Sequence, residues 1–199
     1  MKKWIFLLVM MALSFSVKAQ VTFGARAGIA YTSLTQIIDE EVTYGGRVGF
    51  NVAGLMDIPL SRKFSLRPEL SFISQGGAYS LEFREEETLW QRYKRNYYAV
   101  QVPVSLTYKM FRNEWEFGVY GGPSFSLSTP VKEREGLDER RFRTFDVGAG
   151  AGFYVERYNL FFTIYTNTGL VDRLEEKRPG ESHIYQNNVT FSFGYLFRK

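Results

Sequence analysis

Hydrophobic and polar residues alternate with a period of two along nearly all of the chain after residue 20. In the first such segment Phe23, Ile29 and Tyr31 fall on one side, whereas Thr22 and Arg26 fall on the other. Alternate residues of a β-strand point to opposite faces of a sheet, so this pattern predicts strands rather than helices. The expected strands cover residues 21–32, 42–58, 64–75, 93–109, 115–127, 145–155, 160–164 and 189–197.

The numbering of the hydrophobic positions changes parity at Gly76 and Gly77. Apolar residues before this pair, such as Leu70 and Phe72, have even numbers, whereas Tyr79, Leu81 and Phe83 after it have odd numbers. An extra residue in one strand of a ladder shifts the alternation in this way. We therefore expect a β-bulge at the glycine pair.

The connections between the expected strands are short and long in turn. Short connections are expected near residues 60–63, 111–114 and 156–159, and longer, charged ones near 36–41, 84–91, 129–141 and 169–184. This order is typical of a barrel whose long loops all lie at one end. The sequence predicts an all-β fold, an eight-stranded antiparallel up-and-down transmembrane β-barrel, with both termini on the periplasmic side.

The two faces of the strands distinguish a membrane barrel from a soluble sandwich or a lipocalin-like barrel. One face is rich in glycine, serine and threonine, and the other is bulky and apolar. A membrane barrel turns its apolar face to lipid and its polar face to the lumen. Most of the expected strands also reach the length of about 9–11 residues that crosses a bilayer. Candidates for the interfacial aromatic girdles are Tyr31, Tyr44, Tyr98, Tyr108, Trp115, Tyr195 and Phe197.

Residues 1–19 have the features of a secretory signal peptide. Two lysines precede an uncharged stretch over residues 4–17, and small residues at −3 and −1 precede a cleavage site after Ala19. The uncharged stretch is shorter than the about 20 apolar residues of a spanning helix. We expect residues 20–199 to form the outer-membrane β-barrel domain.

Composition excludes several classes of function. The chain carries a formal charge of +4 and contains no cysteine. Three lysines belong to the expected signal peptide, so the remainder carries +1, which is far from the basic surplus of a nucleic-acid-binding protein. The absence of cysteine excludes disulfides, thiolate metal ligands and a lipoprotein anchor. We expect a protein of the cell outer membrane with no nucleic-acid partner and no cofactor.

Charged residues on the polar face are expected to meet inside the barrel. They are Arg26, Arg47, Arg67, Glu69, Glu116 and Asp146. Such residues form either an ion path or a plug of salt bridges, because charges removed from water need partners. An eight-stranded barrel is only wide enough for its own side chains to fill, which favours the plug.

No set of residues meets the requirements of a catalytic or metal site. His183 is the only histidine and lies beside Ser182 and Glu181, but a catalytic triad is defined by its geometry rather than by neighbours in sequence. A single histidine without cysteine also disfavours zinc. The glycine-rich run over residues 148–152 lacks the strand–turn–helix context of a phosphate-binding loop, so we assign it to close packing in the lumen.

The expected outer loops are dense in charges of both signs. Mixed runs of this kind are usually solvated surface. The alternative is contact with lipopolysaccharide phosphates or with a surface partner, for which the candidates are Trp90, Arg134, Arg140, Arg141, Lys177 and Arg178.

Several short motifs follow one another in the order and spacing of a known family. They are Phe23-Gly24-Ala25-Arg26-Ala27-Gly28, Leu66-Arg67-Pro68-Glu69-Leu70, Val102-Pro103-Val104-Ser105-Leu106 and Phe193-Gly194-Tyr195-Leu196-Phe197. On these motifs the mature chain resembles the small outer-membrane β-barrel family of Bacteroidetes that is often labelled PorT-like. It departs from that family at its end, where Arg198 and Lys199 follow the aromatic residue that usually closes such barrels. The resemblance implies fold and location, whereas a barrel fold does not define an activity.

We therefore expect a non-enzymatic integral outer-membrane protein that is structural, adhesive or accessory and works through its extracellular loops. Its surroundings would be outer-membrane lipid and lipopolysaccharide. The alternatives are an accessory component of a secretion or envelope-assembly system that acts through a protein partner, a lipid-modifying enzyme at the rim, and a small pore.

Overall fold

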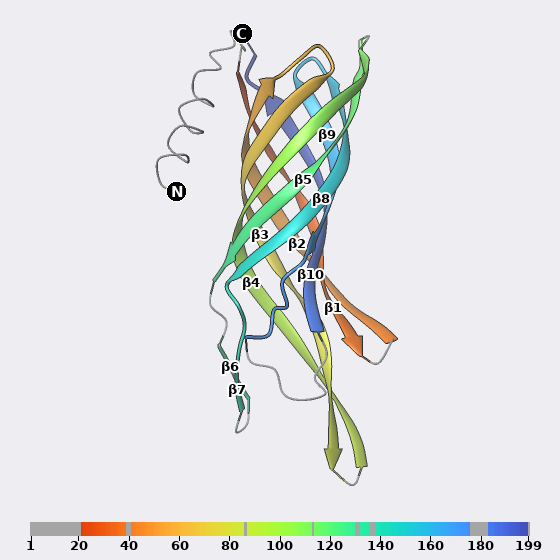
Figure 1. Cartoon of the computed structure of the whole chain (residues 1–199), viewed down its shortest axis with the longest axis vertical. Helices are drawn as coiled ribbons and strands as arrows, with labels where there is room; N and C mark the ends of the chain where they lie inside the picture. Colours follow the sequence, from red (N-terminus) through yellow and green to blue (C-terminus); the bar gives the residue numbers. More distant parts are fainter. Residues whose placement is uncertain are drawn as a thin grey trace, which may run out of the picture.

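Antiparallel strands form a closed barrel in the computed structural model of the chain (Figure 1). The structure describes residues 21–38, 41–85, 87–112, 114–129, 132–135, 138–175 and 183–198. Its strands are β1 (Thr22–Ile38), β2 (Glu41–Pro59), β3 (Phe64–Glu85), β4 (Glu87–Arg112), β5 (Glu116–Ser128), β6 (Lys132–Glu135), β7 (Asp138–Arg141), β8 (Phe145–Arg157), β9 (Leu160–Gly169) and β10 (His183–Leu196). The predicted signal peptide over residues 1–19 lies outside this part. No helix in the described part is long and apolar enough to cross a membrane.

Eight of these strands close the barrel in the order β1-β10-β9-β8-β5-β4-β3-β2. Neighbouring strands run antiparallel, and β1 closes the barrel by pairing with β10 from Gly24 opposite Leu196 to Ile37 opposite His183. β6 and β7 form a separate two-stranded hairpin. The predicted eight-stranded antiparallel up-and-down barrel is confirmed.

The three short connections lie at the same end of the barrel as the described ends of the chain (Figure 1). The turn between β8 and β9 consists of Tyr158 and Asn159, whose φ angles are 49° and 71°. Positive φ at both central residues is the conformation of a type I′ turn, which matches the twist of the paired strands. Between β2 and β3, the Phe64 amide donates a hydrogen bond of 3.1 Å to the Ser61 hydroxyl. The predicted positions of the short connections agree with these turns.

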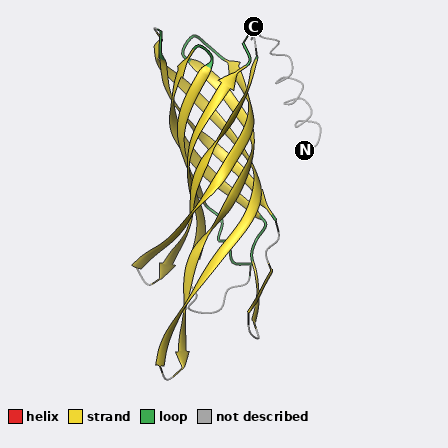
Figure 2. Ribbon diagram, turned by 180° about the vertical axis from the view of Figure 1, so that it is seen from behind, coloured by secondary structure: helices red, strands yellow, loops and turns green. Residues whose placement is uncertain are grey.

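The opposite end differs from the prediction, because three of the four expected loops are largely β-hairpins (Figure 2). β1 reaches Ile38 and β2 begins at Glu41, whereas β3 reaches Glu85 and β4 begins at Glu87. β6 and β7 occupy much of the third expected loop. Charged residues in these segments are typical of loops, but a ladder needs only paired backbone groups, and both faces of a hairpin outside the membrane tolerate charge. The fourth expected loop, between β9 and β10, contains no strand in its described residues 170–175.

The predicted β-bulge at Gly76 and Gly77 is wrong. β3 and β4 keep one register from Phe64 opposite Tyr108 to Glu85 opposite Glu87. Instead, β3 leaves β2 after Ile73 and crosses the inner side of the β1–β2 hairpin. A Cβ on Gly77 would lie 2.5 Å from the Leu34 backbone nitrogen. The apolar residues change parity because this part of β3 has left the lipid-facing wall.

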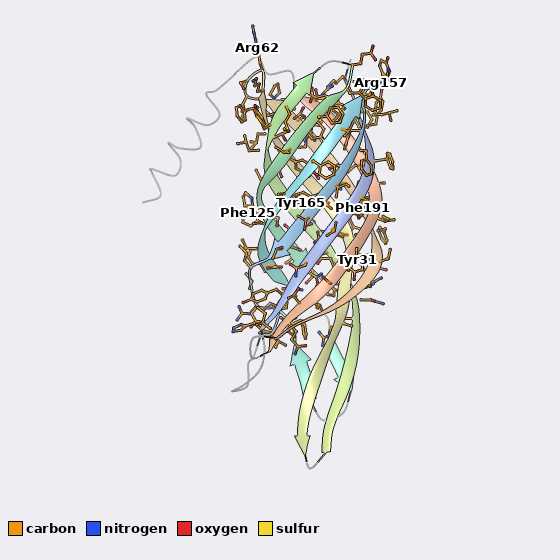
Figure 3. All side chains as sticks on the ribbon, turned by 90° about the vertical axis from the view of Figure 1, so that its right-hand side faces the viewer. Tyr31, Arg62, Phe125, Arg157, Tyr165 and Phe191 are labelled. Carbon is orange, nitrogen blue, oxygen red and sulfur yellow. The ribbon has the colours of Figure 1, made fainter. Side chains whose placement is uncertain are left out.

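The distribution of side chains is the reverse of that in a soluble protein. Large apolar residues cover the outside, where Phe193, Val48 and Leu70 expose 72%, 66% and 62% of their surface. In Figure 3, Phe125 and Phe191 project outward from the barrel wall. Buried positions are mainly polar, and Arg67 is among the largest of the fully buried side chains. This arrangement suits a barrel that has lipid outside and its own side chains inside.

Candidate functional site

The inward-facing side chains form three tiers along the barrel axis, and we call the one nearest the short turns the inner tier. It consists of Asp57, Arg67, Lys109, Glu116, Glu156 and Arg198, together with the ring of Tyr154. Three acids face three bases, so the tier is balanced in charge. The contacts of Arg67 with Asp57 and of Lys109 with Glu116 join neighbouring strands. The contact of Lys109 with Asp57 links β4 to β2, which are not neighbours in the sheet.

Asp57 lies at the centre of the inner tier. Its carboxylate is 3.7 Å from Arg67 Nη2, 3.8 Å from Lys109 Nζ and 3.9 Å from Arg198 Nη2. Lys109 Nζ also lies 3.4 Å from Glu116 Oε1. Asp57 is 3% exposed, so these cations supply the compensation that a buried carboxylate requires.

The remaining contacts of the inner tier close its edges. The Tyr154 hydroxyl donates a hydrogen bond of 2.8 Å to Glu116 Oε1, and the Arg67 guanidinium lies 4.7 Å from the centre of the Tyr154 ring. Arg198 pairs with Glu156 through its guanidinium. The terminal arginine that departs from the family pattern therefore takes part in filling the barrel.

The middle tier is built around the ion pair of Arg26 with Glu69. Arg26 Nη2 lies 2.8 Å from Glu69 Oε2, and Arg26 Nε donates to the same oxygen at 2.9 Å. Arg26 Nη1 donates to Asn51 Oδ1 at 2.7 Å and to the Ser192 hydroxyl at 2.9 Å. The two side chains are 3% and 5% exposed, so the pair is desolvated. Asn51 on β2 and Ser192 on β10 hold the guanidinium in place.

Stacked tyrosines complete the middle tier from the other side of the barrel. The rings of Tyr120 on β5 and Tyr165 on β9 lie 5.4 Å apart and nearly parallel. Glycines on β8 provide their space, because a Cβ on Gly150 would lie 2.0 Å from the Tyr165 hydroxyl oxygen. Gly152 likewise lies against Tyr120. The assignment of the glycine-rich run over residues 148–152 to lumen packing is confirmed.

The outer tier covers the lumen at the hairpin end. The outer tier contains an apolar cluster of Leu34, Phe142, Leu174 and Ile184. This cluster joins β1 and β10 to the segment between β7 and β8 and to the segment between β9 and β10. The Arg95 guanidinium lies 3.4 Å from the centre of the Phe142 ring.

Hydrogen bonds tie the outer tier to the wall. Arg173 donates a hydrogen bond of 2.9 Å to the Ser128 hydroxyl and lies 5.4 Å from the ring of Tyr97. The Tyr97 hydroxyl donates to Gln186 Oε1. In the described part, buried side chains thus meet at three levels inside the barrel.

All six residues proposed from the sequence for the lumen network lie on the inward-facing side, but at different levels. Arg26 and Glu69 form the pair described above, whereas Arg67 pairs with Asp57 and Glu116 with Lys109. Half-buried Arg47 donates to the Gln75 carbonyl at 2.9 Å near the mouth. Asp146 accepts a hydrogen bond of 3.3 Å from the Val171 amide. The structure thus joins these residues to partners on other segments of the chain rather than in one cluster.

Sequence reasoning missed several members of the network. They are Asp57, Lys109, Glu156 and Arg198 in the inner tier, and Arg95 and Arg173 in the outer tier. Asp57 has the same parity as Asn51, and Lys109 the same parity as Gln101, so alternation alone places both on the polar face. Arg173 lies outside any strand and carries no such signal.

The residues proposed for loop contacts lie in strands or outside the described part. Trp90 belongs to β4, Arg134 to β6, and Arg140 and Arg141 to β7, which corrects their placement in loops. Their side chains are outside the described part, as are Lys177 and Arg178.

His183 lies at the start of β10 on the outside of the barrel. Its Nδ1 is 2.9 Å from Asp172 Oδ2, and its ring stacks on Tyr185 with centres 6.1 Å apart. Ser182 and Glu181, its neighbours in sequence, lie outside the described part. Within the described ranges, no group of three His, Cys, Asp or Glu residues is arranged to hold a metal ion.

Known proteins share this architecture. Residues 14–175 match the family profile of the outer membrane protein beta-barrel domain. The solved structure of Ail, the attachment invasion locus protein of Yersinia pestis, is similar with 14% identity and a TM-score of 0.50, covering 88% of this chain and 98% of that chain. Ail in complex with the heparin analogue sucrose octasulfate gives 12% identity and a TM-score of 0.51, covering 89% of this chain and 99% of that one.

A further structure, Neisserial surface protein A, is 12% identical with a TM-score of 0.48, covering 88% of this chain and 97% of that chain. No curated protein sequence matches the chain.

Proposed function

We propose that this chain, which belongs to the outer membrane protein beta-barrel domain family and lies in the outer membrane, is a non-conducting barrel that holds β-hairpins out for contact with an extracellular partner. The proposal has two parts. The filled lumen is the reason for a barrel without transport, and the projecting hairpins are the working surface.

The observation that carries the proposal is the length of the β3–β4 ladder. β2 pairs with β3 as far as Asn51 opposite Ile73, and β5 pairs with β4 as far as Ser128 opposite Ala99. The β3–β4 ladder then continues for twelve pairs, ending at Glu85 opposite Glu87. The first five of these pairs still pack against β1 and β2 and in the outer tier. At ~3.4 Å per residue the remaining seven, from Tyr79 opposite Tyr93, extend about 24 Å beyond that packed part.

The projecting part of this hairpin offers a backbone edge as well as its faces. Among the strands that the structure describes, β3 alone pairs with residues 87–97 of β4. An open edge presents unpaired N–H and C=O groups that a strand of another protein can join. A protein partner that adds a strand therefore suits this surface.

The three tiers favour a plug over an ion path. The buried charges of the inner and middle tiers pair inside the lumen, as Arg26 on β1 does with Glu69 on β3 and Lys109 on β4 with Glu116 on β5. An ion that entered would have to replace these pairs, because an eight-stranded barrel has little width beyond its own side chains.

We also propose that the protein is not an enzyme. His183 is bound to Asp172 and stacked on Tyr185, which supports a structural role for its ring. The finer assignment to the PorT-like barrels of Bacteroidetes is supported by the motifs of residues 66–70 and 102–106. Outer-membrane phospholipid and lipopolysaccharide are the proposed surroundings of the wall.

The attachment role in the printed name of the Yersinia pestis protein makes adhesion the first form of surface contact to test. The wild-type chain and a variant in which Asn-Gly replaces residues 79–93 are expressed on a non-adherent Gram-negative host. Binding of the cells is then measured on immobilised polysaccharides and extracellular-matrix proteins. We expect adhesion above that of the empty host, and its loss in the variant at equal surface expression.

The matched control deletes residues 132–141, which removes the whole β6–β7 hairpin and leaves the β3–β4 ladder intact. If adhesion survives the shortening of β3 and β4 but is lost when β6 and β7 are removed, the smaller hairpin is the contact surface. Cells that adhere no better than the empty host on any surface would contradict the proposal.

A further inference from the structure

The outside of the barrel changes from apolar to polar at the hairpin end of β1, β10 and β9. Tyr31 lies opposite Val189, and the next outward-facing pair along these strands is Ser33 opposite Asn187. Asn187 in turn lies opposite Thr168 on β9. Alternate residues share a face, so these polar side chains continue the line of large side chains that faces lipid.

These polar residues surround a hollow of about 600 Å³ in the outer wall. Its lining includes the polar residues Ser33, Thr35, Thr166, Thr168 and Asn187, together with Ile37, Leu170 and Tyr185. Sites for small ligands commonly have volumes of about 300–1,000 Å³. The hollow is therefore large enough for a ligand and is lined on three adjacent strands.

The Asn187 amide is held in place inside the hollow. Asn187 Nδ2 donates to the Thr35 hydroxyl, which fixes the orientation of the amide. Asn187 Oδ1 is buried, and no group in the described part donates a hydrogen bond to it. Because this oxygen has no exposed surface, the polar groups that a ligand in the hollow meets are those of exposed Thr166 and Thr168. A neutral hydrogen bond to such a hydroxyl contributes about 0.5–1.5 kcal/mol.

The lining selects the class of ligand. It contains no charged side chain, so nothing in it would neutralise a phosphate or a cation. Hydroxyl and amide groups beside the ring of Tyr185 and the apolar side chain of Leu170 suit a neutral sugar, which has polar edges and an apolar face. The hollow also lies directly beyond the apolar band, where Ile29 and Phe191 are exposed to lipid.

That level corresponds to the headgroups of the outer leaflet if the hairpins face outward, as the proposed function requires. We propose that this hollow binds a neutral sugar of an outer-leaflet glycolipid headgroup, with lipopolysaccharide as the expected source. The acyl chains of the same lipid would lie along the apolar wall below it. This inference rests on the proposed orientation of the barrel and is independent of adhesion.

The test uses the mature protein purified from outer membranes into detergent micelles. Native mass spectrometry measures binding of three probes: rough-type lipopolysaccharide, its deacylated core oligosaccharide, and phosphatidylethanolamine. We expect lipopolysaccharide to bind, the oligosaccharide to compete with it, and phosphatidylethanolamine to compete poorly. Equal competition by phosphatidylethanolamine, or no competition by the oligosaccharide, would overturn the proposal, because the wall would then recognise acyl chains alone.

Two variants test the hollow itself. The double substitution of Thr166→Val and Thr168→Val removes two hydroxyl groups at constant volume, and Tyr185→Leu removes the aromatic face. Loss of two neutral hydrogen bonds should weaken lipopolysaccharide binding about tenfold. The matched control is Thr129→Val, an exposed threonine bonded to the Tyr98 carbonyl on the opposite wall, which should leave binding unchanged. Unchanged binding in both hollow variants, with barrels folded as judged by heat-modifiable gel migration, would refute the site.

Discussion

Removal of the Glu69 carboxylate measures directly whether the lumen is dry. The substitution Glu69→Gln keeps the shape of the side chain and leaves the Arg26 guanidinium charged. In the native barrel two nitrogens of Arg26 lie 2.8 and 2.9 Å from one Glu69 oxygen. The hydrogen bonds of Arg26 to Asn51 and Ser192 remain in the variant, but they are to neutral groups and do not balance the charge.

The expected magnitude follows from the burial of the pair. Its side chains are 3% and 5% exposed, so the pair is a buried one, for which loss of a partner costs about 3–5 kcal/mol. The glutamine amide still offers an oxygen to Arg26, which places the expected loss at the lower end, about 3 kcal/mol. If water filled the lumen, the pair would behave like a surface salt bridge, and the loss would be about 0–1 kcal/mol.

The assay is equilibrium unfolding in denaturant of barrels refolded into phospholipid vesicles, followed by tryptophan fluorescence and gel migration. Arg26→Met, Glu69→Gln and the double variant complete a cycle that isolates the coupling between the two residues. The pair of Arg157 with Glu114 provides the matched control. Its atoms are 3.0 Å apart, but its side chains are 34% and 76% exposed.

We expect a coupling of about 2 kcal/mol or more for the lumen pair, and much less for the surface pair. A loss in Glu69→Gln no greater than that in Glu114→Gln would show that the lumen is hydrated. In that case the plug would be wrong, and the small pore would become the better interpretation.

Three further predictions follow from the packing of the barrel. Purified wild-type protein should give no steady channels in planar bilayers, and steady single-channel currents would contradict the plug. Gly150→Val should destabilise the barrel by about 1–3 kcal/mol through overpacking against Tyr165, whereas Gly54→Val, where a Cβ meets nothing within 4 Å, should be tolerated; equal unfolding midpoints for the two would contradict this. Replacing Tyr158-Asn159 by Asn-Gly should stabilise the barrel by about 1 kcal/mol, because both residues have positive φ, and a lower unfolding midpoint would count against a type I′ turn.

The strands, their faces and the short turns could be predicted because each leaves a local pattern in the sequence. Phe23, Ile29 and Tyr31 alternate with polar residues, and the structure places these three on the outside. The same alternation predicts that Arg26 and Glu69 face the lumen. Their meeting across β1, β2 and β3 depends on the tilt and stagger of the strands, which no single segment encodes.

The hairpins were missed for a related reason. Residues 84–91 carry several charges and have no apolar face, so they lack the signal that identifies a half-buried strand. In the structure the ladder from Glu85 opposite Glu87 continues inward without a register shift, so backbone pairing extends it beyond the membrane. The parity change at Gly76 has the same origin, because β3 stops being part of the lipid-facing wall at that point.

The charged lumen also restricts how the strands can pair. A slip of β1 by one residue would exchange its two faces, moving Arg26 to the lipid side and Ile29 to the lumen. An arginine that faces lipid near the middle of the bilayer costs about 2–4 kcal/mol, and Glu69 would at the same time lose its partner. A purely apolar interior would lack this penalty, since either face of β1 could then point inward. The ion pairs that fill the barrel therefore contribute to its register as well as to its closure, and the double variant of Arg26 and Glu69 should fold with less uniform register even where its stability is preserved.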